Sequence, residues 1–198
     1  ETANQTINFS IGNTQASAIG NNAIKSDGTS TAAAAGTVAG TIRANTTALQ
    51  TFTVQGNGTT STYAAAAGAS AYAIAQGINA ASGSTGVSAT ATTTATLSAF
   101  TAGSQSFTIQ GAPKADGSAN PVTVTATMAT ATDVGGLAAA INAQSGVTGI
   151  NAIADTATGK ISLTQSQGYD IGVTNNLTAN NSTTLTGASG AGVALVRG

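Results

Sequence analysis

The sequence contains no cysteine and no histidine. Without cysteine no disulfide can form, so the fold must hold without covalent cross-links. Without either residue, a Ser-His or Cys-His nucleophile and a typical zinc site are both excluded. The six acids are dispersed along the chain: Glu1, Asp27, Asp116, Asp133, Asp155 and Asp170. The sequence therefore predicts no enzyme, no catalytic or metal site and no bound cofactor.

Charge is equally scarce, with five basic and six acidic residues among 198 and a formal net charge of -1. The basic residues are scattered: Lys25, Arg43, Lys114, Lys160 and Arg197. Nucleic-acid binding needs clustered lysine and arginine, so we expect no nucleic-acid partner. No apolar run approaches the length of a membrane span, so we expect no membrane partner either. The chain opens without methionine or a basic leader, and we expect it to be an excised piece of a longer protein.

Large apolar side chains are few: the chain has four phenylalanines, three tyrosines and no tryptophan. Much of its 41% hydrophobic content is alanine, which predicts a thin core of small residues between a sheet and a helix. Low charge alone does not indicate disorder, because disordered chains usually combine low hydrophobicity with high charge. A solvated surface rich in threonine, serine, asparagine and glutamine favours β structure.

The most informative feature is a segment that occurs twice. "SAYAIAQGINAASGSTGVSA" (70–89) aligns without a gap on "DVGGLAAAINAQSGVTGINA" (133–152), 63 positions further on. Ser70 and Asp133 are suitable N-cap residues, because their short side chains can accept a first-turn amide hydrogen. Gly83 and Gly146 suit the left-handed residue that ends a helix. Both segments are therefore expected to begin with a short capped helix.

An apolar stripe supports each expected helix. The stripe follows the spacing i, i+3, i+7 in both copies: Ala71, Ile74 and Ile78, then Val134, Leu137 and Ile141. Asn79 and Asn142 lie beside the stripe. Each could hydrogen-bond a neighbouring loop, or could simply be solvated, and the sequence does not decide between these.

Alternating runs flank both helices and predict half-buried strands. "FTVQG" (52–56) precedes the first helix, and "FTIQG" (107–111) with "PVTVTATM" (121–128) precedes the second. Further alternating runs follow each helix. In the second of these runs "TATGK" predicts a turn, with Ile161 and Leu163 facing inward. Each unit is therefore expected to read strand, strand, helix, strand, strand.

Two glycine motifs have a structural and a ligand-binding interpretation. Asp27-Gly28 and Asp116-Gly117 are tight-turn pairs, and hairpin turns are favoured because calcium would need several carboxylates on one loop. "GASGAGVAL" (187–195) has the glycine spacing of a phosphate loop, but it lacks the lysine and the strand–helix frame. We therefore expect a flexible linker there.

The quoted segments resemble a known family. "AIAQGINAASGSTGVSA" and "LAAAINAQSGVTGINA", each preceded by "FT[VI]QG", are similar to the flagellin hook IN motif, across roughly residues 50 to 175. "ANQTINFSIGNTQASAIGNNAI" (3–24) is similar to the segment where a flagellin leaves its filament-core domain. Ala18-Ile19-Gly20 stands where the family usually has a Leu-Gly pair, and the departure from the pattern is Gln5, where an acid is common.

This resemblance implies a structural function, that of a solvent-exposed outer domain of a flagellin subunit. It implies an extracellular location on the flagellar filament, with roles in motility, surface display and antigenic variation. The implied partners are other flagellin subunits and O-linked glycans, and the fragment alone is expected to be monomeric. The core-forming terminal helices of flagellin are absent from this sequence.

The expected fold is α+β, mainly β, with two related ββαββ modules, each a small sheet covered by one short helix. The expected parts are an outgoing segment at 1–44, modules at 45–100 and 101–176, and a return segment at 177–198. The alternatives are a flagellar cap or hook-associated protein domain, or an adhesin or glycan-binding module. Tyr63, Tyr72 and Tyr169 are too few and too dispersed in sequence to predict the aromatic platform of a sugar site.

Overall fold

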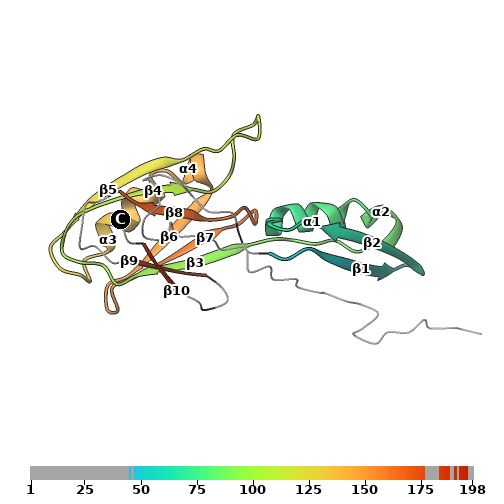
Figure 1. The fold of residues 1–198 in the computed structure, drawn as a ribbon, viewed down its shortest axis with the longest axis horizontal. Coiled ribbons are helices and arrows are strands. Elements are labelled where there is room, and N and C mark those ends of the chain that lie inside the picture. Colours follow the sequence, from blue (N-terminus) through green and yellow to red (C-terminus); the bar gives the residue numbers. More distant parts are fainter. Residues whose placement is uncertain (1–44, 46, 177–182, 188–189, 191, 196–198) are drawn as a thin grey trace, which may run out of the picture.

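The computed structural model describes residues 45, 47–176, 183–187, 190 and 192–195. Within these residues the chain is mainly β, with three small sheets and a few short helices (Figure 1), which confirms the α+β class. The predicted outgoing segment 1–44, including the flagellin-like stretch 3–24 and the Asp27-Gly28 turn, lies outside the described residues. No helix in the described part is both long and apolar enough to span a bilayer.

The first element is a two-stranded antiparallel hairpin, β1 (Gln50–Gly56) and β2 (Thr59–Ala65). Asn57 and Gly58 form its turn with positive φ angles of 48° and 70°. This is the backbone of a type I′ turn, whose twist matches that of the strands it joins. The strand predicted at 52–56 is confirmed.

Helix α1 (Ala71–Asn79) covers this hairpin. Ser70 caps it as predicted, accepting a 3.2 Å hydrogen bond from the Ala73 amide. The predicted stripe faces the sheet, and Ile74 and Ile78 are buried against Ala65. A two-stranded sheet is marginal alone, so this helix supplies the cover that makes the hairpin stable.

Strand β3 (Thr93–Ser98) does not stay with the first hairpin. It pairs antiparallel with β7 (Lys160–Gln165) and with β9 (Thr183–Gly187). The first unit thus holds three strands rather than the expected four, and its third strand joins the sheet of the second unit. The alternation of buried Ala95 and Leu97 explains this, because only the larger body offers a core to bury them.

The second unit begins with β4 (Gly103–Gln110) and β5 (Val122–Met128), an antiparallel pair joined through the predicted turn at Asp116-Gly117. Gly117 has a φ of 80°, and Asp116 accepts hydrogen bonds from the Ser118 amide and hydroxyl. Strand β8 (Gly172–Asn175) pairs with the other side of β4, giving a sheet of order β5-β4-β8.

Helix α3 (Gly135–Asn142) carries the second predicted stripe, and Val134, Leu137 and Ile141 are fully buried. The prediction that Asp133 caps this helix is wrong. The N-cap position is Val134, without a side-chain cap, and the Asp133 carboxylate instead accepts from the Ala129 amide at 3.2 Å. The acid is used by the turn that leads out of β5, so it is not available to the helix.

The remaining strands complete a five-stranded sheet of order β10-β9-β3-β7-β6. β6 (Ile150–Asp155) and β7 are joined by the predicted turn, and Ile161 and Leu163 face inward as expected. The flexible linker predicted at 187–195 is wrong for part of its length. Gly192–Leu195 form β10, which pairs with β9, and Leu195 is buried because its side chain joins the main core.

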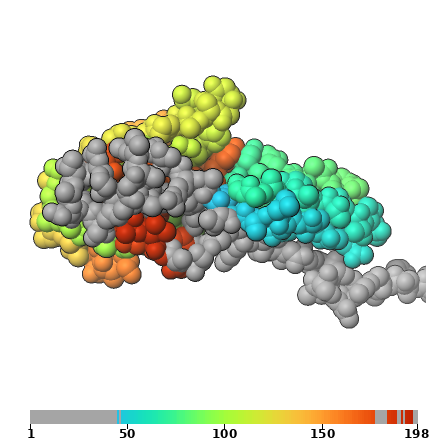
Figure 2. Space-filling view, viewed as in Figure 1, coloured from blue at the N-terminus to red at the C-terminus, as the bar shows by residue number. Residues whose placement is uncertain are grey.

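One core lies between the three-stranded and the five-stranded sheets. It draws side chains from both sheets and from α3, including Phe107, Ile109, Leu97, Leu137 and Leu163. α3 packs against both β5 and β6, so it closes one side between the two sheets. The hairpin with α1 projects from one end of this body, as the blue-green part of Figure 2 shows. The molecule is therefore elongated, with a small unit at one end.

Candidate functional site

The described residues hold no cluster of three or more acids, histidines or cysteines that could bind a metal ion. Asp116 and Asp155 lie in exposed turns, where hydrogen bonds from Ser118 and from Thr158 respectively lower their pKa. Asp133 ends a turn, and Asp170 lies between the two units. Glu1 and Asp27 are outside the described residues. The arrangement that recurs in this molecule is a helix–strand junction, and it is built from neutral groups.

An asparagine at the end of each helix joins it to the chain that follows: Asn142 of α3 binds strand β6, and Asn79 of α1 binds the segment before β3. Asn142 donates through Nδ2 to the Ala152 carbonyl oxygen at 2.8 Å and accepts at Oδ1 from the Ala152 amide at 2.6 Å. Asn79 makes the same two bonds with Ala89, at 2.9 and 2.7 Å. Of the two interpretations left open by the sequence, the bond to a neighbouring segment is therefore the observed one. We call this paired contact the asparagine clamp.

The clamp has a clear consequence at β6, which is an edge strand of the five-stranded sheet. Ala152 lies opposite Leu163 of β7, and its amide and carbonyl point away from β7 toward α3, where Asn142 binds them. A primary amide places one of its two N–H donors beside its carbonyl acceptor, so it can pair with the N–H and C=O of one strand residue. Asn142 therefore continues the ladder by one residue and blocks an edge that could otherwise pair with another chain.

A threonine-glycine pair turns the chain between helix and strand in both units. After α1 and α3 come one-turn helices, α2 (Ser82–Thr85) and α4 (Ser145–Thr148). The Thr148 hydroxyl donates to the Gln144 carbonyl at 3.0 Å and accepts from the Ile150 amide at 3.2 Å. Thr85 makes the equivalent bonds to Ala81 and Val87.

The left-handed residues are Gly86 and Gly149, with φ of 68° and 69°. The prediction that Gly83 and Gly146 hold this position is wrong, since both lie inside the short helices. After Asn79 and Asn142 the chain continues through the short helices α2 and α4. These helices end at Thr85 and Thr148, whose hydroxyls accept from the amides of Val87 and Ile150.

A second pair of glycines fits beneath these turns. Gly111, just past the end of β4, lies so close to the Thr148 carbonyl oxygen that a Cβ would be 2.1 Å from it. Gly56, at the end of β1, stands in the same relation to the Thr85 carbonyl oxygen, also at 2.1 Å. The adjacent Ala112 amide donates to the Thr148 oxygen at 2.7 Å. The glycine that ends both predicted "QG" strands is thus required by close packing, which the sequence alone did not reveal.

The two units meet at a junction around Gly168, which has a φ of 83°. The Gly168 carbonyl accepts from the Tyr72 amide at the start of α1, at 2.8 Å. Tyr72 and Tyr169 stack with their ring centroids 4.2 Å apart. Tyr72 and Tyr169 are dispersed in sequence, but the fold brings these two rings together.

Asp170 forms the second contact of the junction. Its Oδ2 accepts from the Asn45 side-chain amide at 2.8 Å, and its buried Oδ1 has no hydrogen-bond partner among the described residues. Burial raises the pKa of Asp170 from 3.8 to about 6, and the Asn45 bond offsets part of that rise. The carboxyl group is therefore held in a site that disfavours its charge.

We expect Asp170 to make stability depend on pH. Because its folded pKa of about 6 exceeds the unfolded value of 3.8, the folded state binds the proton more tightly. Its contribution is complete below about pH 4 and is lost as pH rises through 6. Allowing for partial solvent screening, the loss should be about 1–2 kcal/mol. Denaturant unfolding between pH 4 and 7.5 measures it, and Asp170→Asn should flatten this component of the profile. An unchanged profile in the variant would contradict the assignment.

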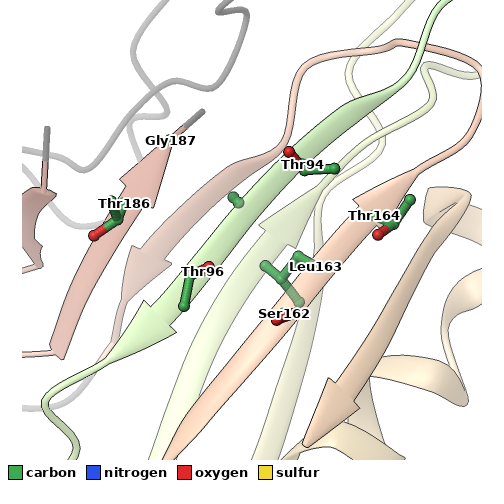
Figure 3. A pocket seen from close by; sticks show the side chains of 8 residues that line it. Thr94, Thr96, Ser162, Leu163, Thr164, Thr186 and Gly187 are labelled. Carbon is green, nitrogen blue, oxygen red and sulfur yellow. The ribbon is translucent and has the colours of Figure 1, made fainter. Parts of the chain in front are cut away.

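The outer face of the five-stranded sheet carries hydroxyl side chains from three neighbouring strands. Figure 3 shows Thr94 and Thr96 of β3 between Thr186 of β9 and Ser162 and Thr164 of β7. Opposed residues match across the strands, with Thr96 opposite both Ser162 and Thr186. A shallow cavity of about 340 Å³ lies over this face. It offers donors and acceptors without charge, so it favours neutral polar contacts.

The comparisons with known proteins agree with the duplicated architecture. The family model described as the flagellin hook IN motif matches residues 51–103 and again residues 106–167. Together the two matches cover more than half of the chain, and each contains one asparagine clamp and one threonine-glycine turn. A comparison with curated proteins finds no match.

Proposed function

The chain belongs to the flagellin hook IN motif family, a family of structural proteins of the flagellar filament, and from this premise we propose that it forms a solvent-exposed outer domain of a flagellin subunit. The proposed parts are the outgoing segment 1–44, the modules 45–100 and 101–176, and the return segment 177–198. One observation carries the proposal: the residues that both matches share are used for packing and backbone hydrogen bonds. Asn142, Thr148 and Gly111 are all engaged in this way.

A scaffold of this kind suits display on a filament. The asparagine clamp blocks the β6 edge, which reduces unwanted strand pairing where many copies stand close together. The proposed roles are surface display, antigenic variation and support of motility, with other flagellin subunits as partners. The 198-residue chain alone is proposed to be monomeric, which sedimentation equilibrium can measure.

Antibody labelling of intact cells tests the outer-domain proposal. Antibodies raised against residues 45–176 should label native flagella along the whole shaft. Deleting the same residues from the complete protein should leave filaments that still assemble and are thinner. Labelling confined to the tip or to the hook junction would instead support the alternative, a cap or hook-associated protein. Failure of the deleted protein to polymerise would contradict an outer position.

The outer face of the five-stranded sheet, with its threonine and serine side chains, is the proposed attachment surface for O-linked glycans. Thr94 and Ser162 are exposed, and between β3 and β7 they lie opposite Thr164 and Thr96, while Ile153 of β6 lies on the other side of Ser162. We expect peptides from native filaments to carry added mass at these two positions. Thr94→Val and Ser162→Ala should remove it without unfolding the sheet, because valine retains strand propensity. Unmodified peptides spanning both positions would contradict the proposal.

A further inference from the structure

A small cavity of about 290 Å³ lies beside the tyrosine pair, between α1 and two segments of the larger body. Its walls come from three places in the sequence: Tyr72, Gln76 and Asn79 of α1, residues 89–91 before β3, and Ser166 with Gln167 after β7. Its volume is just below the range of about 300–1,000 Å³ that is typical of small-molecule sites. The cavity therefore suits a ligand of about one ring.

Tyr72 supplies the aromatic wall of the cavity, and Tyr169 stacks on it from outside the lining. Tyr72 is held by stacking on Tyr169 and by the 2.8 Å bond that the Gln76 amide donates to its hydroxyl oxygen. A hydrogen bond between the two tyrosine side chains lowers the pKa of Tyr72 and raises that of Tyr169.

The rest of the wall is polar and uncharged. Gln76, Thr90, Ser166 and Gln167 are exposed side chains that can each donate and accept hydrogen bonds. The apolar part consists of three alanines, Ala75, Ala89 and Ala91, which leave room for a ring. Among the described residues no lysine or arginine lines the cavity, so these walls offer a phosphate or carboxylate ligand no countercharge.

We propose that this cavity binds one ring of a neutral carbohydrate. A sugar ring has an apolar C–H face that can pack on an aromatic ring, and hydroxyls that both donate and accept, as the amide and hydroxyl rim does. A wholly apolar ligand would leave the rim groups unpaired. Sugar binding would be distinct from the scaffold role. It depends on the junction between the two units of one chain and does not require assembly into a filament.

Tyrosine fluorescence and saturation-transfer NMR test the proposal on the 198-residue chain. The chain has no tryptophan, so its emission reports three tyrosines only. The probes are the methyl glycosides of neutral hexoses and of N-acetylhexosamines, with glucuronic acid for comparison. At least one neutral glycoside should change the emission saturably and receive magnetisation from the protein through its ring protons. If none of the neutral glycosides binds, or if glucuronic acid binds more tightly, the proposal is wrong.

Matched variants locate the binding. Tyr72→Ala and Gln76→Ala should each weaken binding, the tyrosine change by about tenfold. The control is Tyr63→Phe, which removes a hydroxyl bonded to the Ala73 carbonyl and does not line the cavity. Gln76 is exposed, so its variant should fold even if Tyr72→Ala loosens the junction. If Gln76→Ala leaves the affinity unchanged and Tyr63→Phe weakens binding as much as Tyr72→Ala does, the ligand binds elsewhere and the proposal is wrong.

Discussion

Replacing Gly111 with alanine should lower the free energy of unfolding by about 3 kcal/mol, which is at the upper end for overpacking in a tight site. The new Cβ would lie 2.1 Å from the Thr148 carbonyl oxygen and about 3 Å from two side-chain atoms of Ile150. That oxygen belongs to the backbone, so it can move only if the turn moves. The bond from the Ala112 amide to the same oxygen would be strained as well. Urea denaturation followed by circular dichroism measures the loss.

Gly146→Ala is the matched control for this prediction. Gly146 lies in α4, only two residues before Thr148, and a Cβ there would meet no atom within 4 Å. Its φ is not positive, so alanine should be neutral or stabilising by about 0.5–1 kcal/mol. Equal losses from both substitutions would show that any added methyl group disturbs this region, and the close-packing explanation would then fail.

Much of the local structure was predictable because the spacing of apolar residues along the sequence indicates which side chains are buried. The stripes on α1 and α3 and the inward Ile161 and Leu163 all follow from spacing alone. The Ser70 cap followed from residue type. Asp133 is an equally suitable residue type, but its carboxylate accepts from the Ala129 amide in the turn before α3 and does not cap the helix. A local motif thus identifies candidate partners, and the backbone around it decides which of them is used.

The contacts that were missed depend on residues distant in sequence. Nothing near Gly56 or Gly111 shows that a threonine carbonyl will lie above each, although both glycines precede the duplicated helices. The Tyr72–Tyr169 stack likewise exists only because the segment after β7 returns to α1. A signal for the threonine-glycine turns was present, because Thr85-Gly86 and Thr148-Gly149 align at the same 63-residue spacing as the helices.

Strand pairing was the least predictable level. β3 follows the first helix in sequence, yet it pairs with β7 and β9. Alternation identifies a strand and its buried face, and it does not specify which neighbour the strand will choose. The choice depends on which core is large enough to cover Ala95 and Leu97, and that is a property of the assembled body.

Replacing Asn142 with alanine should lower the free energy of unfolding by about 2–3 kcal/mol. The substitution removes two hydrogen bonds to Ala152, whose backbone is buried, so both groups lose their partner without gaining full access to water. Asn79→Ala should have a smaller effect, about 1 kcal/mol, because water can reach the half-buried Ala89 more easily. Chemical denaturation of both variants against the unsubstituted chain measures the difference.

The edge-blocking role of the clamp adds a second readout to this prediction. Asn142→Ala should expose the β6 ladder groups and increase self-association, which light scattering at rising concentration detects. Asn151→Ala is the control, because Asn151 is an exposed asparagine of β6, the strand that Asn142 binds. This substitution should change the free energy of unfolding by no more than about 0.5 kcal/mol. Asn142→Asp separates the two bonds, since it keeps an acceptor for the Ala152 amide and places a second oxygen against the carbonyl. That variant should regain stability when acid protonates the new carboxylate. Equal stability of all three variants would show that the clamp is incidental to the fold.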